Sequence, residues 1–188
     1  MVRVVAFDIG VCNFAWCVAD VNEGSNPVII QLNNCRIGNA KDPIAVLMHS
    51  MAAVLHQHKS TVQDGIQNVR IEQQVTLRAS KNQSLSAALY MFYASLQAAG
   101  HVSLQSVEFV HPRAKFKKAL ALPYAVLDPF RTDLKQARGP ALKKISVNVT
   151  KVLLQHWHCD EAYAQICAAK KQDDLADSCS YACLCWNS

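Results

Sequence analysis

The sheet of this protein begins in residues 2–21, VRVVAFDIGVCNFAWCVADV. Apolar residues, several of them valine, alternate through residues 2–10, which is typical of a β-strand. The segment GVCN at 10–13 predicts a tight turn, and FAWCVADV at 14–21 predicts a second strand. PVIIQLNNCRI at 27–37 predicts a third. Strands joined by such short connections form an antiparallel meander.

Helical and strand patterns alternate after the meander. Residues 42–58 have apolar side chains at helical spacing, with Asp42 as the expected N-cap and Pro43 as the first helical residue. A short strand is predicted at 66–74, followed by a helix at 84–100 that ends in glycine.

The remaining segments complete an α/β protein. A fifth strand is predicted at 102–112 and a short basic helix at 115–122. Three prolines make residues 123–140 read as a long loop. Helix resumes after Pro140, and the last helix begins near Gln172. This order predicts one domain, residues 1–188, with a mixed sheet, helices on its faces and a basic loop and helix insertion at about 113–144.

The helix at 84–100 is apolar almost all the way round. One stripe is formed by Leu85, Leu89, Phe92 and Leu96, and others by Ala87, Ala88, Met91 and Ala94. Such a helix needs cover on more than one side. The sheet can cover one side, and a second copy of the protein can cover another.

Composition excludes a membrane-spanning protein. Of 188 residues, 51 % are hydrophobic and 18 % charged, and no stretch approaches the roughly 18 apolar residues of a span. The first residues form a strand and not a signal or transit peptide. We therefore expect a soluble, intracellular protein. A virus, a phage or a processed form is the favoured source, and in the viral case the protein would act at the viral replication site.

The eight cysteines do not predict disulfides or zinc. Six replace small apolar residues within strand or helix patterns, as free buried thiols do: Cys12, Cys17, Cys35, Cys167, Cys179 and Cys183. His156, His158 and Cys159 lie close together in HWHCD, but no cysteine pair has the CxxC spacing of a zinc site.

Positive charge is concentrated in one segment. Residues 113–144 hold nine basic side chains against two acidic ones, within a net charge of +5 for the chain. Such a surface can be merely solvated, or it can bind phosphates. The side chains expected to contact phosphate are Lys115, Lys117, Lys118, Arg138, Lys143 and Lys144.

Two carboxylates end apolar strands. Asp8 follows VVAF and points to the same side of its strand as Val4 and Ala6. Glu72 ends NVRI in the same way. A bare carboxylate in such surroundings is costly unless it is paired or binds a metal ion. Neighbouring strands lie about 4.8 Å apart, so both side chains can reach one ion.

The last helix supplies further carboxylates. Asp174 and Asp177 share one helical face, and Asp173 can replace Asp174 because a spacing of four serves as well as three. This face can also be only the solvated side of the helix. Together with Asp8 and Glu72 the set is purely oxygen donors, which select Mg²⁺ or Mn²⁺ and suffice for two ions. Two-ion sites hydrolyse phosphodiesters.

Three stretches resemble motifs of one known family. FDIGVCN at 7–13, IEQQ at 71–74 and KQDDLADS at 171–178 resemble, in order, motifs of the RuvC-like Holliday junction resolvases, nearest the fungal mitochondrial and poxvirus-type branch. The resemblance implies an RNase H-like fold whose five-stranded sheet has three antiparallel strands and then two parallel strands. It also implies a homodimer that cuts a four-way DNA junction symmetrically with Mg²⁺ or Mn²⁺, in DNA recombination and repair.

The resemblance also assigns residues. Asp8, Glu72, Asp174 and Asp177 take the places of the metal ligands, and the helix at 84–100 is where relatives dimerise. Arg78 and Lys81 lie where relatives have an arginine-rich run that contacts the junction. Because phosphate contacts carry no sequence information, recognition is expected to be of junction shape.

Two alternatives remain open. The carboxylates fit equally well an RNase H-like nuclease that cuts RNA in hybrids. A protein that binds junctions or duplexes without cutting would also use the basic segment, but it would not need the carboxylates.

Overall fold

The computed structural model describes residues 1–74 and 80–185. Its centre is a five-stranded sheet in the order β3-β2-β1-β4-β5. The strands are β1 (Val2–Ile9), β2 (Phe14–Val21), β3 (Val28–Cys35), β4 (Asn68–Glu72) and β5 (Ser106–Val110). The first three are antiparallel, and β4 and β5 run parallel to β1. The predicted sheet is confirmed.

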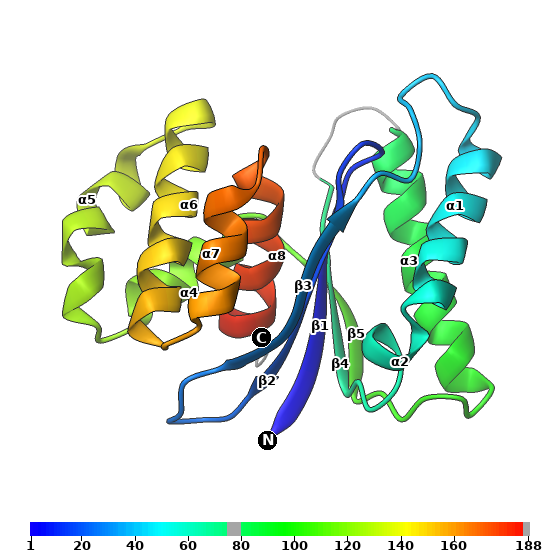
Figure 1. The fold of residues 1–188 in the computed structure, drawn as a ribbon, viewed down its shortest axis with the longest axis horizontal. Coiled ribbons are helices and arrows are strands. Elements are labelled where there is room, and N and C mark those ends of the chain that lie inside the picture. The colour runs from blue at the N-terminus through cyan, green and yellow to red at the C-terminus, as the bar shows by residue number, and fades with distance from the viewer. Residues whose placement is uncertain (75–79, 186–188) are drawn as a thin grey trace.

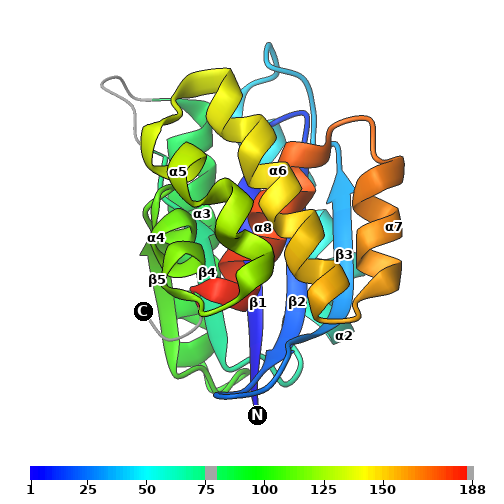
Figure 2. The ribbon, with the colours of Figure 1, turned by 90° about the vertical axis from the view of Figure 1, so that its left-hand side faces the viewer.

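Helices cover both faces of this sheet (Figure 1). One face carries α1 (Ile44–Gln57), α2 (Lys59–Val62) and α3 (Lys81–Ala98). The other carries α4 (Ala114–Ala121), the 3₁₀ turn η1 (Ala125–Leu127), α5 (Asp128–Gln136), α6 (Gly139–His156), α7 (Asp160–Ala168) and α8 (Gln172–Leu184). Helix α8 lies directly on the sheet and α6 packs over α8 (Figure 2).

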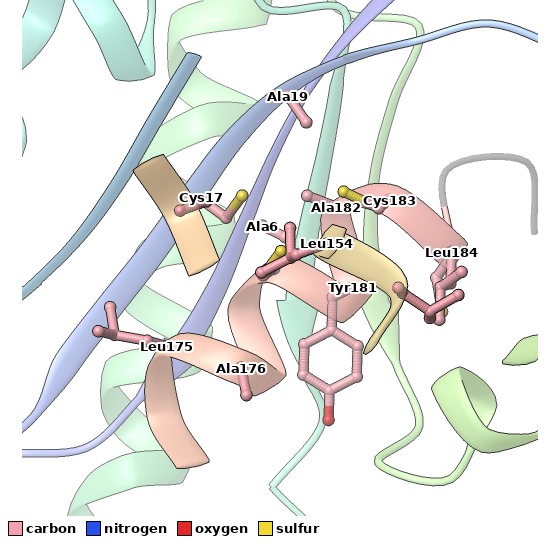
Figure 3. Close-up of a cluster of buried hydrophobic side chains, with 14 of the residues drawn as sticks. Ala6, Cys17, Ala19, Leu154, Leu175, Ala176, Tyr181, Ala182, Cys183 and Leu184 are labelled. Atoms are coloured by element: carbon pink, nitrogen blue, oxygen red, sulfur yellow. The ribbon is translucent and has the colours of Figure 1, made fainter. Parts of the chain in front are cut away.

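The pleat of β1 separates two cores. Val5 and Phe7 pack towards α1 and α3, whereas Val4 and Ala6 pack towards α8. Where α8 meets the sheet, several facing side chains are small, including Ala6, Cys17 and Ala19 from the strands and Ala176, Ala182 and Cys183 from the helix (Figure 3). Small side chains on both surfaces let α8 lie close to the strand ends.

The predicted N-cap of α1 is wrong. The helix begins at Ile44, with Pro43 in the cap position and no side-chain capping bond. The Asp42 carboxylate instead accepts a hydrogen bond from the backbone N–H of Asn39 at 2.7 Å, within the loop. Helix α3 has a true capping box, in which Ser80 and Gln83 bond reciprocally, and this starts the helix three residues before the predicted position.

The predicted loop at 123–140 is also wrong, because η1 and α5 occupy most of it. Pro129 lies in the first turn of α5, where a proline costs no helical hydrogen bond. Arg131 pairs with Asp128 at 2.7 Å and donates to the carbonyls of Leu120 and Leu122, which ties α5 to the end of α4. Helices α2 and α7 were not predicted.

All eight cysteines are free thiols. Cys12 and Cys167 are exposed, which contradicts the expectation that they are buried, whereas Cys17, Cys179 and Cys183 are buried as expected. In the described part of the chain no helix is both long and apolar enough to span a membrane.

Candidate active site

Asp8 and Glu72 come together because β1 and β4 are parallel neighbours. The register pairs Phe7 with Ile71, so the next residues, Asp8 and Glu72, follow side by side at the ends of their strands. Alternation directs them to the α8 side, where Arg70 of β4 also reaches the Cys185 carbonyl at 2.9 Å.

The two carboxyl groups interact directly. Burial, a side-chain hydrogen bond with Glu72 and the Glu72 charge together raise the pKa of Asp8 well above its ordinary value of 3.8. The charges of Asp177 and Asp174 raise it further. A carboxyl group beside another negative charge ionises only at a cost, so without a bound cation Asp8 favours its protonated form.

Helix α8 brings Asp174 and Asp177 to the same place. Its first turn, which starts at Gln172, contains Asp173 and Asp174, and Asp177 follows one turn later. Burial raises the pKa of Asp177, although Lys115 opposes the shift. The Ser146 hydroxyl of α6 donates to Asp177 Oδ1 at 3.2 Å.

The structure distinguishes the two neighbouring aspartates. Asp174 is buried, and within the described residues its Oδ2 has no hydrogen-bond partner. Burial would raise the pKa of Asp173, but the hydrogen bond and charge of Lys143, 2.9 Å away, bring it below the ordinary value. Asp174 therefore belongs to the carboxylate cluster, whereas Asp173 faces a lysine at the surface.

Lys115 lies inside this cluster. Its Nζ is 2.5 Å from Asp177 Oδ1 and 4.8 Å from the centre of the Tyr181 ring, and the residue is only 4 % exposed. The basic pattern of 115–122 predicted a surface lysine. The structure instead places this ammonium group as the counter-ion of a buried carboxylate. Lys171 has a similar position at the rim, 2.8 Å from Asp174 Oδ1.

Tyr181 is a site residue that sequence reasoning missed. Its hydroxyl donates to Glu72 Oε1 at 3.1 Å. In Figure 3 the hydroxyl of Tyr181 points away from the neighbouring sulfur and aliphatic side chains. A signal was present, because Tyr181 lies one helical turn after Asp177 in a helix made mostly of small residues.

The cluster fits a hard divalent cation chemically, although it is not preformed as a metal site. Within residues 1–74 and 80–185, no group of three or more His, Cys, Asp or Glu side chains is arranged to hold an ion as it stands. However, Asp174 Oδ2 has no hydrogen-bond partner within the described residues, and the adjacent carboxyl groups of Asp8 and Glu72 crowd negative charge at the strand ends. Carboxylate oxygens of this kind suit Mg²⁺ or Mn²⁺.

The other predicted DNA contacts are spread over the α8 side and beyond it. Lys117, Arg138, Lys143 and Lys144 are exposed, and Lys118 is half-buried. Lys81 donates to the carbonyls of Ala40 and Asp42 at 2.6 Å. Arg78 lies outside the described residues.

Comparisons with known proteins support the fold. Neither a protein-family model nor a curated protein sequence matches this chain. The yeast mitochondrial Holliday junction resolvase Ydc2 is 19 % identical, with a TM-score of 0.64 over 96 % of this chain and 77 % of that one. Thermus thermophilus RuvC is 17 % identical, with a TM-score of 0.55 over 96 % and 90 %.

A viral structure is similar to the same degree. The fowlpox virus resolvase, solved with Holliday junction DNA, is 15 % identical, with a TM-score of 0.55 over 94 % of this chain and 91 % of that one. The chain therefore has the fold of the RuvC-like resolvases, and the predicted RNase H-like fold is confirmed.

Proposed function

We propose that this protein is a structure-selective endonuclease that cuts four-way DNA junctions by paired, symmetric nicks. The observation that carries the proposal is the meeting of Asp8, Glu72, Asp174 and Asp177, from two strands and a helix, beside a basic surface. The similarity to resolvase structures supports the choice of substrate.

Mg²⁺ or Mn²⁺, with two ions at each site, is the proposed cofactor, held by these four carboxylates. When bound, such ions make water a better nucleophile and stabilise the leaving oxygen of a phosphodiester. Neighbouring residues hold the carboxylates in position. Tyr181 donates a hydrogen bond to Glu72, and Lys115 and Ser146 both contact Asp177.

A homodimer is part of the proposal, because a junction presents two equivalent strands and a two-fold protein places one site on each. The outer face of α3 supports it. Met91 is 62 % exposed, and Tyr90 stacks on the exposed Phe109 of β5, with ring centres 5.3 Å apart. Each copy would be a single domain. Its insertion at 113–144, which consists mainly of α4, α5 and the start of α6, would lie on the same side of the sheet as the bound DNA.

The test is cleavage of a synthetic four-way junction with Mg²⁺, comparing Asp174→Asn with Asp173→Asn. These neighbours match in size and charge, but only Asp174 belongs to the cluster. We expect Asp174→Asn to lower cutting at least 100-fold with junction affinity retained, and Asp173→Asn to lower it less than tenfold.

Three results would contradict the proposal. They are unchanged cutting by Asp174→Asn, degradation of the RNA strand of a hybrid in preference to the junction, and junction binding by the native protein without metal-dependent nicks. The second result would indicate a hybrid nuclease, and the third a binding protein.

A further inference from the structure

A groove of about 840 Å³ lies next to the carboxylate cluster. Three segments distant in sequence form it: the turn after β1, the end of β3 with the following loop, and the connection from α7 to α8. Its polar and charged lining consists of Asn13, Asn33, Asn34, Arg36, Gln165, Lys170 and Lys171.

The charge of this groove has one sign. Arg36, Lys170 and Lys171 line it, and no carboxylate does. The remaining polar lining is amide, which can donate hydrogen bonds without adding negative charge. None of these three cations belongs to the basic segment that the sequence indicated at 113–144.

A second hollow of about 400 Å³ adjoins the groove at the start of α8. The two hollows share Lys170 and Lys171, and the second adds Lys143 and Lys144 together with Asp173, which pairs with Lys143. A basic path therefore crosses the N-terminal turn of α8, where Asp173 and Asp174 lie.

The path is joined to the candidate site at both borders. Lys171 bonds to Asp174 Oδ1 at 2.8 Å. On the opposite side, Cys12 and Asn13 belong to the turn that follows β1, whose end carries Asp8. A chain lying in the groove would thus enter the carboxylate cluster.

We propose that this groove binds the sugar–phosphate backbone of the DNA strand that leads to the site of cutting. Ammonium, guanidinium and amide groups are the donors that proteins use for phosphate oxygens. This inference rests on the proposed nuclease function and assigns a strand path to it. Binding there is independent of base sequence.

Salt dependence of binding tests the charges. Each phosphate contact contributes about 0.9 to the slope of log affinity against log salt. The double variant Arg36→Ala/Lys170→Ala should therefore lower the slope for a four-way junction by about 2. Lys170→Glu should weaken binding at low salt by more than tenfold, whereas Lys59→Glu, which changes an equally exposed lysine on the α1–α2 face, should have little effect. Unchanged slopes would overturn the inference.

Two exposed thiols give an independent test in the unaltered protein. Cys12 lines the groove, whereas Cys167 is exposed but does not line it. Iodoacetamide should modify Cys12 several-fold more slowly when the junction is bound in the absence of divalent metal, and Cys167 at an unchanged rate, as read by peptide mass spectrometry.

The outcomes separate the two proposals. Equal modification of Cys12 with and without bound junction overturns the groove while leaving the nuclease intact. A native protein that neither binds nor cuts the junction overturns the proposed function, and the groove with it.

Discussion

The hydroxyl of Tyr181 and the carboxylate of Glu72 form a hydrogen bond of 3.1 Å that joins α8 to the end of β4. Lys115 lies over the same ring and bonds to Asp177. One aromatic side chain therefore contacts both a strand carboxylate and the counter-ion of a helix carboxylate, so it sets the spacing between them.

Tyr181→Phe should weaken metal-dependent cutting while preserving packing. Loss of one hydrogen bond lowers the free energy of unfolding by about 1 kcal/mol. Partners that orient metal ligands are worth roughly 10- to 100-fold in metal affinity, so we expect the Mn²⁺ concentration for half-maximal cutting to rise about tenfold.

Tyr93→Phe is the matched control. Tyr93 is equally buried and donates to the Val62 carbonyl at 2.7 Å, but it lies in the core on the other face of the sheet. It should lose similar stability without changing the metal requirement. If Tyr181→Phe and Tyr93→Phe need the same Mn²⁺ concentration for half-maximal cutting, Tyr181 does not position a metal ligand.

Lys115→Met should destabilise the metal-free protein because it leaves Asp177 without its cation. Removing one member of a buried ion pair costs about 3 kcal/mol. Thermal unfolding measures the loss, and Lys117→Met, which changes an exposed lysine two residues away, should be nearly neutral. The double variant Lys115→Met/Asp177→Asn should regain much of the stability, because it no longer carries an unpaired charge. A double variant no more stable than Lys115→Met would contradict this account.

Asp8→Asn should separate stability from activity. It removes the repulsion between two adjacent carboxyl groups, so the metal-free variant should melt higher than the native protein at neutral pH. A ligand at 100 times its dissociation constant stabilises a protein by about 2.7 kcal/mol. We expect Mn²⁺ to raise the melting temperature of the native protein more than that of the variant, which should not cut. Equal shifts would place the ion elsewhere.

Met91→Asp should disrupt the proposed dimer without unfolding the chain, because Met91 is exposed on α3. Val46→Asp on α1 is the control, as Val46 is also an exposed apolar residue, 49 % accessible. Sedimentation velocity should show monomers only for Met91→Asp. Leu89 is unsuitable for this purpose since it is fully buried. If Met91→Asp and Val46→Asp both remain dimers, the interface does not involve this face of α3.

The sequence predicted the sheet and the strand carboxylates because both are local signals. Alternation in β1 and β2 reveals the strands, and an acidic residue such as Asp8 or Glu72 at the end of an apolar run conflicts visibly with its neighbours. No local pattern shows that those strands meet the last helix; this was expected from the chemistry of the combined carboxylates and from the resemblance.

Features that depend on long-range contacts were missed. Tyr181 acts on a residue 109 positions away. Lys115 lies in a basic helix whose composition indicates a surface, and only packing against α8 shows that it is buried. Helix α5 was hidden by the prolines at 123, 129 and 140, although Pro129 in fact fits the first turn of the helix.

The placement of α8 after every strand has a consequence for synthesis of the protein. Translation delivers Asp8 and Glu72 early, but Asp174 and Asp177 leave the ribosome only after the entire sheet and the seven other α-helices of the described chain. A partly made polypeptide therefore carries only two of the four candidate carboxylates. Under the proposed function, cutting of nucleic acid would begin only after α8 has packed on the sheet.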